Sequence, residues 1–207
     1  MFKLLHIQAS PRGLKSYSVR VAGAFIEGFR QSHPQAGVET LALFDSDFPE
    51  FRAPEASAKY AVLSGRQPKD ADAAAWKPVI EAINRFKSAD GYLFSVPMWN
   101  FGVPYRLKQY IDVIVQPGLT FSYSPAEGYK GLVTGRPAML VLSRGGTYPD
   151  ESAKSLDFQE SYMRTVLGFI GITDLRSIIV EGTLTPDAEK NLAESIKQAQ
   201  AAGKKFP

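Results

Sequence analysis

The sequence predicts a single α/β domain in which helices cover both faces of a doubly wound, five-stranded parallel sheet. Five short apolar segments alternate along the chain with longer segments in which apolar residues recur every three or four positions. Such alternation favours parallel strands joined by helical crossovers. The 207 residues are 44% hydrophobic, with 17 glycines and 14 prolines spread along the chain, so we expect one domain over residues 1–207.

The first half of the chain supplies three of the five strands. Lys3–Gln8 is a short apolar run that stops at a loop with proline and glycine. Apolar positions from Val19 to Phe29 have helical spacing, and Ser16 or Ser18 is placed to cap that helix. The other elements expected here are a strand over Val38–Phe44, a helical piece around Ala56–Leu63, a helix from Asp70, a strand over Gly91–Val96 and a helix over Tyr105–Val115.

The second half begins with a small excursion from the core elements. Leu119–Tyr123 and Leu132–Thr134 flank a turn that contains glycine and proline, which favours a β-hairpin. The remaining elements are strands over Pro137–Leu142 and Leu175–Val180, a helix over Phe158–Phe169 and a final helix from about Pro186.

The composition excludes several kinds of chemistry. The chain has no cysteine, which rules out disulfides, thiolate metal sites and thiol redox reactions. The net charge of +3 is small; it indicates no nucleic-acid partner and is compatible with anionic ligands. No segment approaches the roughly 20 apolar residues that cross a bilayer, and the N-terminus lacks the features of a signal peptide. We therefore expect a soluble, cytoplasmic protein without a membrane partner.

The two histidines do not indicate a metal site. His6 lies inside the first strand and is expected to be a hydrogen-bonded core residue, whereas His33 precedes Pro34 and is expected to be exposed. Neither has a companion at metal-ligand spacing. No serine stands in the glycine-flanked pattern of a hydrolase nucleophile, so hydrolysis has no support either.

The loop after the first strand is rich in hydroxyl groups. Ser10 lies in this loop, and Ser16, Tyr17 and Ser18 lie at the start of the next helix. Hydroxyls and free backbone N–H groups at a helix N-terminus bind a phosphate monoester without a lysine. The loop lacks the Gly-x-Gly-x-x-Gly pattern of dinucleotide sites, so a mononucleotide phosphate fits better. The alternative is that these serines are ordinary cap and loop residues.

The loop after the third predicted strand carries large aromatic side chains. Pro97, Met98, Trp99, Asn100 and Phe101 follow one another there, just before a second proline. A flavin ring needs an apolar or aromatic wall and backbone N–H donors, and this loop offers both. The alternative is a packing turn that closes the end of the sheet.

The fourth strand ends on Ser143, Arg144, Gly145 and Gly146. Paired glycines allow close backbone approach, and the hydroxyl and guanidinium are suited to the pyrimidine edge of a flavin. Alone, this string is more often a simple turn. In an open parallel sheet, however, ligands bind at the carboxyl ends of the strands, so we expect this loop to lie beside the other two.

Taken together, these segments resemble the bacterial FMN-dependent NADH:azoreductases. The resemblance covers nearly the whole chain and rests on seven segments: Ser10 with Ser16-x-Ser18, Pro97–Phe101, Leu107–Asp112, Gly118–Phe121, Gly131–Gly135, Leu142–Gly146 and Leu167–Ile172. It implies a flavodoxin-like fold, one FMN per subunit and a homodimer with active sites at the subunit interface. It also implies hydride transfer from NADH or NADPH through FMN to quinones and azo compounds.

The resemblance also assigns roles to residues. Ser10 and Ser16–Ser18 would hold the FMN phosphate, Met98–Phe101 the isoalloxazine and Ser143–Gly146 its pyrimidine side. Tyr123 and, from the partner subunit, Phe169 would shape the substrate pocket. Trp99 replaces a tyrosine found in many relatives, which bears on the choice of acceptor.

We expect a ping-pong cycle in which the electron donor and the acceptor occupy the same place in turn. A flavodoxin-type carrier of single electrons is the alternative, which the slightly basic charge and the extra hairpin disfavour. A phosphodiesterase acting on acyl carrier protein has no metal or nucleophile constellation to support it.

Overall fold

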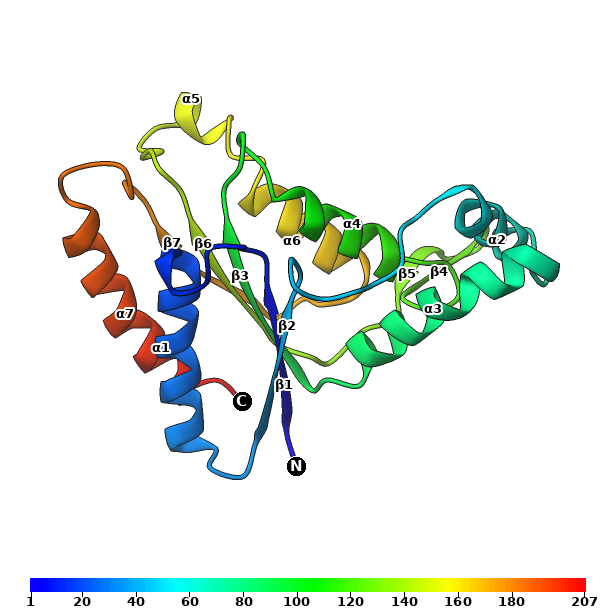
Figure 1. Ribbon diagram of the computed structural model, residues 1–207, viewed down its shortest axis with the longest axis horizontal. Helices are drawn as coiled ribbons and strands as arrows, with labels where there is room; N and C mark the ends of the chain where they lie inside the picture. Colours follow the sequence, from blue (N-terminus) through cyan, green and yellow to red (C-terminus); the bar gives the residue numbers. More distant parts are fainter.

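A five-stranded parallel sheet forms the middle layer of the protein (Figure 1). The computed structural model describes all residues from 1 to 207. The strands are β1 (Lys3–Gln8), β2 (Gly37–Ala42), β3 (Gly91–Pro97), β6 (Ala138–Ser143) and β7 (Leu175–Val180), and they lie side by side in the order β2-β1-β3-β6-β7. All four neighbouring pairs are parallel, as the alternation of strands and helices predicts. The strand order reverses beside β1, which is where such sheets bind ligands.

Helices cover both faces of the sheet (Figure 1). The helices on one face are α1 (Tyr17–Ser32) and α7 (Ala188–Lys204), and those on the other are α3 (Asp70–Lys87), α4 (Tyr105–Ile114) and α6 (Glu160–Phe169). Shorter elements are the 3₁₀ turn η1 (Gly13–Lys15), α2 (Ala53–Leu63) and α5 (Glu151–Lys154). None of the helices combines the length and the apolar composition that crossing a bilayer requires.

The central strands are apolar throughout because both of their faces are covered. Every residue of β6 is buried, and its side chains alternate between two hydrophobic clusters. Leu140 and Leu142 belong to the cluster under α3, α4 and α6, whereas Met139 and Val141 belong to the one under α1 and α7. This alternation is the two-residue period of a strand. Each fully buried leucine contributes about 1.5–3 kcal/mol of hydrophobic stabilisation.

Two glycines bring α1 and α7 into close contact. A Cβ atom at Gly28 would lie 2.1 Å from the carbonyl oxygen of Gln200, and one at Gly203 would lie 2.1 Å from that of Phe25. Neither position therefore tolerates a side chain while the helices keep this separation. The contact fixes α1 against the sheet and with it the N-terminus of α1.

The predicted hairpin exists, but its second strand is not Leu132–Thr134. The strands are β4 (Phe121–Ser124) and β5 (Gly128–Gly131). Pairing resumes directly at Gly128, which has a φ of +70° and closes the turn. Val133 is fully buried instead, and its N–H donates to the carbonyl of Ile170, so the segment after β5 packs against the end of α6.

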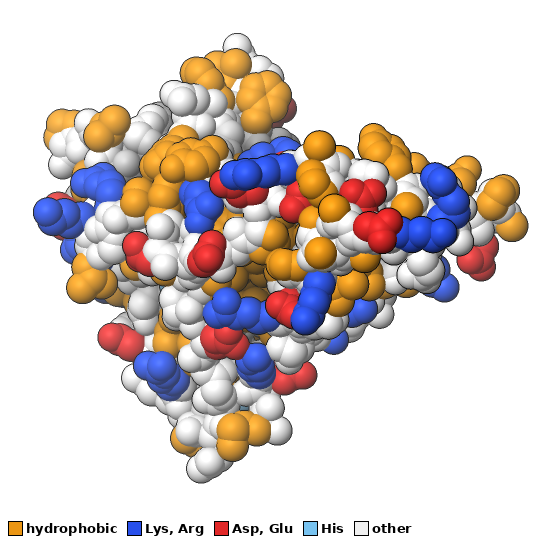
Figure 2. Space-filling view, turned by 45° about the vertical axis from the view of Figure 1, so that its right-hand side comes forward, with side chains coloured by type: hydrophobic (Ala, Val, Ile, Leu, Met, Phe, Trp, Pro, Cys, Tyr) orange, Lys and Arg blue, Asp and Glu red, His pale blue; other side chains and the backbone are white.

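The surface mixes charges of both signs. Figure 2 shows acidic and basic side chains interspersed over one face of the molecule, so that this face has no extended patch of a single sign. The mixture agrees with the small formal charge of +3.

Candidate cofactor site at the carboxyl ends of the strands

A cavity of about 190 Å³ lies where β1, β3 and β6 end. The predicted residues that line it are Ser10, Ser16 and Tyr17 from the loop after β1, Pro97, Met98 and Trp99 from the end of β3, and Ser143, Arg144 and Gly145 from the end of β6. The structure thus brings together three loops that are far apart in the sequence. A larger cavity of about 610 Å³ lies between α3 and the segment after β2, and it shares no residue with these loops.

The β1 loop presents the open N-terminus of α1. Ser16 occupies the N-cap position, but its side chain accepts no hydrogen bond from the helix; its Oγ instead lies 3.1 Å from Oγ of Ser18. The prediction that a serine side chain caps this helix is therefore wrong. The first intrahelical bond runs from the N–H of Arg20 to the carbonyl of Ser16, and the first turn holds no acidic residue. The earlier N–H groups remain available to an anion.

The hydroxyls of this loop are buried beside those N–H groups. Ser10 and Ser16 are each 3% exposed, and Ser18 is fully buried. The Oγ of Ser10 accepts the N–H of Arg12 at 3.4 Å, which folds the loop back over the end of β1. Buried hydroxyls at the positive end of a helix dipole suit a phosphate group. These residues therefore fit a mononucleotide phosphate.

The loop after β3 contains a strained turn. Trp99 and Gly102 exchange two backbone hydrogen bonds of 3.0 Å, and the residues between them, Asn100 and Phe101, have φ values of 47° and 69°. Asparagine tolerates this left-handed conformation, whereas in phenylalanine it costs about 1–2 kcal/mol. Strain of this kind concentrates at functional sites.

The turn directs its side chains outward from the fold. Phe101 is 52% exposed, and Asn100 lines an adjoining open cavity together with Trp99. Trp99 packs against Phe44 and Tyr105, with ring centres 5.7 and 6.2 Å away. Trp99 is thus part of an aromatic cluster at this strand end, and Asn100 and Phe101 lie at the outer edge of that cluster.

The loop after β6 is held by the loops on either side. The carbonyl of Ser143 accepts the N–H of Met98 at 2.7 Å, which joins the ends of β6 and β3. The carbonyls of Gly145 and Gly146 accept N–H groups from the segment after β7. Two residues of that segment, Thr183 and Leu184, also line the cavity. The sequence interpretation missed them, although the rule that ligands bind at strand ends applies to β7 as well.

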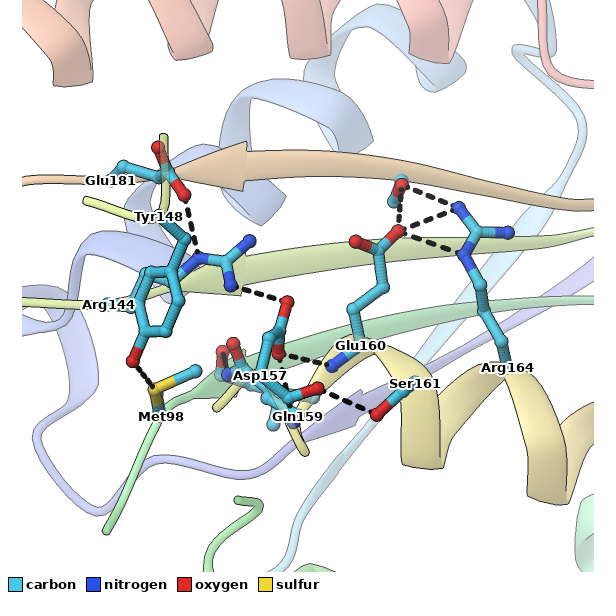
Figure 3. Close-up of polar contacts among 11 residues, drawn as sticks. Met98, Arg144, Tyr148, Asp157, Gln159, Glu160, Ser161, Arg164 and Glu181 are labelled. Atoms are coloured by element: carbon cyan, nitrogen blue, oxygen red, sulfur yellow. Dashed lines mark hydrogen bonds and ion pairs between the residues drawn. The ribbon is translucent and has the colours of Figure 1, made fainter. Parts of the chain in front are cut away.

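The guanidinium of Arg144 is paired with carboxylates of the protein. It is 4% exposed, its Nη1 donates to Oδ2 of Asp157 at 2.5 Å, and its Nε lies 3.2 Å from Oε1 of Glu181 (Figure 3). The ring of Tyr148 lies over the guanidinium, 4.6 Å from its carbon to the ring centre. Two carboxylates thus balance this charge within the protein.

Tyr123 and Phe169 do not line the cavity of their own chain. They belong to an aromatic cluster between the hairpin and the end of α6. Phe169 lies 4.8 Å from Phe121 and 5.5 Å from Tyr129, and Tyr129 lies 4.9 Å from Tyr123, all measured between ring centres. Tyr123 remains 60% exposed. The cluster is an aromatic surface apart from the strand ends.

The histidines have structural roles. Nε2 of His6 lies 2.9 Å from Oγ of Ser95, its Nδ1 lies 3.4 Å from Oγ1 of Thr40, and burial lowers the pKa of His6 to about 4. The expectation of a hydrogen-bonded core histidine is confirmed. His33 is half-buried rather than exposed, because its ring stacks on Phe29 with centres 4.7 Å apart.

Known proteins of the same kind match this chain over nearly its whole length. A family model described as having a flavodoxin-like fold matches residues 2–202. A protein of Desulfotalea psychrophila named FMN-dependent NADH:quinone oxidoreductase is 48% identical over 190 residues, which are 92% of this chain and 90% of that protein. A protein of the same name from Nitratidesulfovibrio vulgaris is 45% identical over the full length of both chains.

Solved structures agree with this assignment. An azoreductase from Bacillus anthracis str. Sterne superposes with a TM-score of 0.91 at 28% identity and covers 100% of both chains. An FMN-dependent NADH-azoreductase from Bacillus anthracis str. Ames Ancestor, solved in complex with FMN, has a TM-score of 0.89 at 27% identity and covers 99% of each chain. With its strand order, its three converging loops and these relatives, the chain belongs to the flavodoxin-like family that includes the FMN-dependent NADH:quinone oxidoreductases.

Proposed function

We propose that the protein is an FMN-dependent oxidoreductase that passes hydride from NADH or NADPH to quinones and azo compounds. The observation that carries this proposal is the meeting of three loops at the β1/β3 edge, beside a helix N-terminus whose first N–H groups have no side-chain acceptor. The names of the relatives support the same chemistry.

The FMN phosphate would bind at the start of α1. Ser10, Ser16 and Ser18 would donate hydroxyl hydrogen bonds, and Tyr17 would contribute the backbone at the first turn of the helix. Each charge-assisted hydrogen bond contributes about 1.5–3 kcal/mol, so a few of them bind a dianion tightly without a cation. The burial of Ser10 and Ser16 strengthens these bonds by excluding water.

The loops after β3 and β6 would hold the flavin ring. Pro97–Phe101 would form an aromatic wall with backbone donors, and Ser143–Gly146 would approach the pyrimidine side through its backbone. When bound, FMN supplies a two-electron carrier that accepts hydride at N5 and returns it to an acceptor in a ping-pong cycle. The chain positions both reactants and keeps water from the ring, and no side chain acts as a nucleophile.

We further propose a homodimer in which Phe169 of the partner subunit and Tyr123 complete the substrate pocket. The aromatic cluster around these residues lies apart from the cavity of its own chain, and a second copy is the source from which it could reach a flavin. We also propose that the protein works in the cytoplasm.

Anaerobic stopped-flow absorbance tests this function. Flavin absorbance should bleach when the FMN-loaded protein is mixed with NADH or NADPH and should return when a quinone or an azo dye is added. Failure of the first half-reaction would exclude a nicotinamide donor. Return of colour only with a protein electron acceptor would favour the electron-carrier alternative.

A further inference from the structure

We propose that Arg144 and Asp157 are positioning residues that hold the two walls of the cofactor site at a fixed separation. The inference rests on the proposed function and concerns the side chains of these residues, which face each other rather than the cofactor. The sequence places Arg144 in a wall of the site, but the structure turns its guanidinium toward Asp157 and Glu181 (Figure 3).

Arg144 joins the end of β6 to its surroundings through four residues. Its N–H donates to the carbonyl of Val180, and its own carbonyl accepts from both the N–H and the hydroxyl of Thr183. Its guanidinium adds the ion pairs with Asp157 and Glu181. Because the side chains of Arg144 and Asp157 are 4% and 13% exposed, solvent screens this pair little, and its geometry constrains the backbone of the wall.

Asp157 extends the connection to the other wall. Its Oδ1 accepts the N–H groups of Gln159 and Glu160 at 3.0 Å, at the start of α6, while its Oδ2 accepts from Arg144. The side chain of Gln159, which is fully buried, donates to the carbonyl of Val96 in β3. The N–H of Phe158 donates to the carbonyl of Phe101 in the strained turn. One tripeptide, 157–159, is therefore bonded to the ends of both β6 and β3.

Tyr148 makes a second link between the walls. Its ring covers the guanidinium of Arg144, and its hydroxyl donates to Sδ of Met98 at 3.0 Å (Figure 3). Met98 lines the cofactor cavity, and its N–H is bonded to Ser143. Movement of Arg144 would thus be transmitted to Met98 as well as to the loop that begins at Ser143.

The two carboxylate oxygens of Asp157 have different partners, so a substitution can remove the ion pair with Arg144 and keep the hydrogen bonds to α6. The side-chain oxygen of asparagine can accept the same two N–H groups, so Asp157→Asn keeps the bonds at the start of α6 and removes the charge that pairs with Arg144. Arg144→Lys keeps a positive charge but lacks the planar fork that reaches two carboxylates at once. Both variants should fold, and in both the loop after β6 should lose its side-chain connection to Asp157.

A matched control exists on the same chain. Arg176 and Asp174 form an ion pair with distances of 3.1 and 2.9 Å, but their side chains are 45% and 50% exposed. They lie at the start of β7, at the opposite end of that strand from Glu181. Asp174→Asn and Arg176→Lys change the same residue types without touching the site.

The experiment is an FMN titration of the apoproteins by fluorescence quenching, combined with visible circular dichroism of the FMN-saturated forms and the melting temperature of each apoprotein. We expect Arg144→Lys and Asp157→Asn to weaken FMN binding about tenfold or more. The double variant should bind no more weakly than the weaker single variant, because the two residues act as one unit. The visible dichroism of both saturated variants should differ from that of the wild type, and the control variants should match the wild type.

Four results would overturn the inference. FMN affinity that falls in Arg144→Lys but not in Asp157→Asn would make Arg144 a direct ligand. Lower melting temperatures with unchanged FMN affinity and unchanged dichroism would leave only a structural role. A wild-type protein that binds no FMN would refute the proposed function and this inference together, whereas variants that bind like the wild type would refute this inference alone.

Discussion

Alanine at two glycines of α1 should change the stability of the protein in opposite directions. Gly23 and Gly28 lie on the same helix, but a Cβ atom at Gly23 meets nothing within 4 Å, whereas one at Gly28 meets the backbone of Gln200. Gly23→Ala should raise the free energy of unfolding by about 0.5–1 kcal/mol, because alanine loses less backbone entropy in a helix than glycine does.

Gly28→Ala gains the same helix propensity but meets a backbone atom that cannot rotate away. The new Cβ would lie 2.1 Å from the carbonyl oxygen of Gln200, about 1.3 Å inside ordinary van der Waals contact. Overpacking of this kind costs about 1–3 kcal/mol, and more when neighbouring backbone must shift. We expect a net loss of about 1–2 kcal/mol, and therefore a difference of about 1.5–3 kcal/mol between the two variants.

Urea unfolding followed by far-ultraviolet circular dichroism measures both values, provided that the m values of the variants agree. Separation of α1 from α7 should also displace the N-terminus of α1, so Gly28→Ala should bind FMN more weakly than Gly23→Ala. An increase in stability for Gly28→Ala equal to that for Gly23→Ala would refute the close helix contact.

The remaining predictions concern single side chains. Ser16→Ala should weaken FMN binding by about 10- to 100-fold in a fluorescence titration, because it removes one charge-assisted hydrogen bond. The stability of the apoprotein should change little, because the Ser16 side chain does not cap α1. An FMN affinity equal to that of the wild type would contradict this role of Ser16. His6 has a pKa of about 4 when folded against 6.5 when unfolded, so the unfolded state binds the proton more tightly and the free energy of unfolding should fall by on the order of 3 kcal/mol between pH 7 and pH 4. His6→Gln should lose this part of the pH dependence, and urea unfolding profiles that stay parallel in the two proteins would argue against it. Phe169→Ala should raise KM for a quinone in steady-state assays while one FMN still binds per chain, and an unchanged KM would remove Phe169 from the substrate pocket.

The strands were the part of the fold that the sequence predicts best. β3 and β6 lie between two layers of helices, so nearly every residue is apolar and the run stands out from its surroundings. β5 was missed because its residues, Gly128–Gly131, carry little strand signal; the turn before it sets the pairing. The apolar segment Leu132–Thr134 packs against the end of α6 instead.

The site was predictable in its location and less so in its details. The rule for strand ends brought Ser10, Trp99 and Ser143 to one place because it depends only on topology. The side chain of Arg144 could not be placed, because its partners come from Asp157 and from the end of the next strand, and such tertiary pairs leave no local pattern. The left-handed conformation of Phe101 could not be predicted either, because phenylalanine has no preference for that conformation.

FMN binding is the measurement that tests the central claim most directly. The purified protein, or its apoprotein mixed with FMN, should show a bound-flavin spectrum, and the titration should saturate at one FMN per chain. Ser16→Ala should shift that titration to higher FMN concentration without changing its end point. A protein that stays colourless and leaves FMN fluorescence unquenched at saturating concentration would contradict a cofactor site at the ends of β1, β3 and β6.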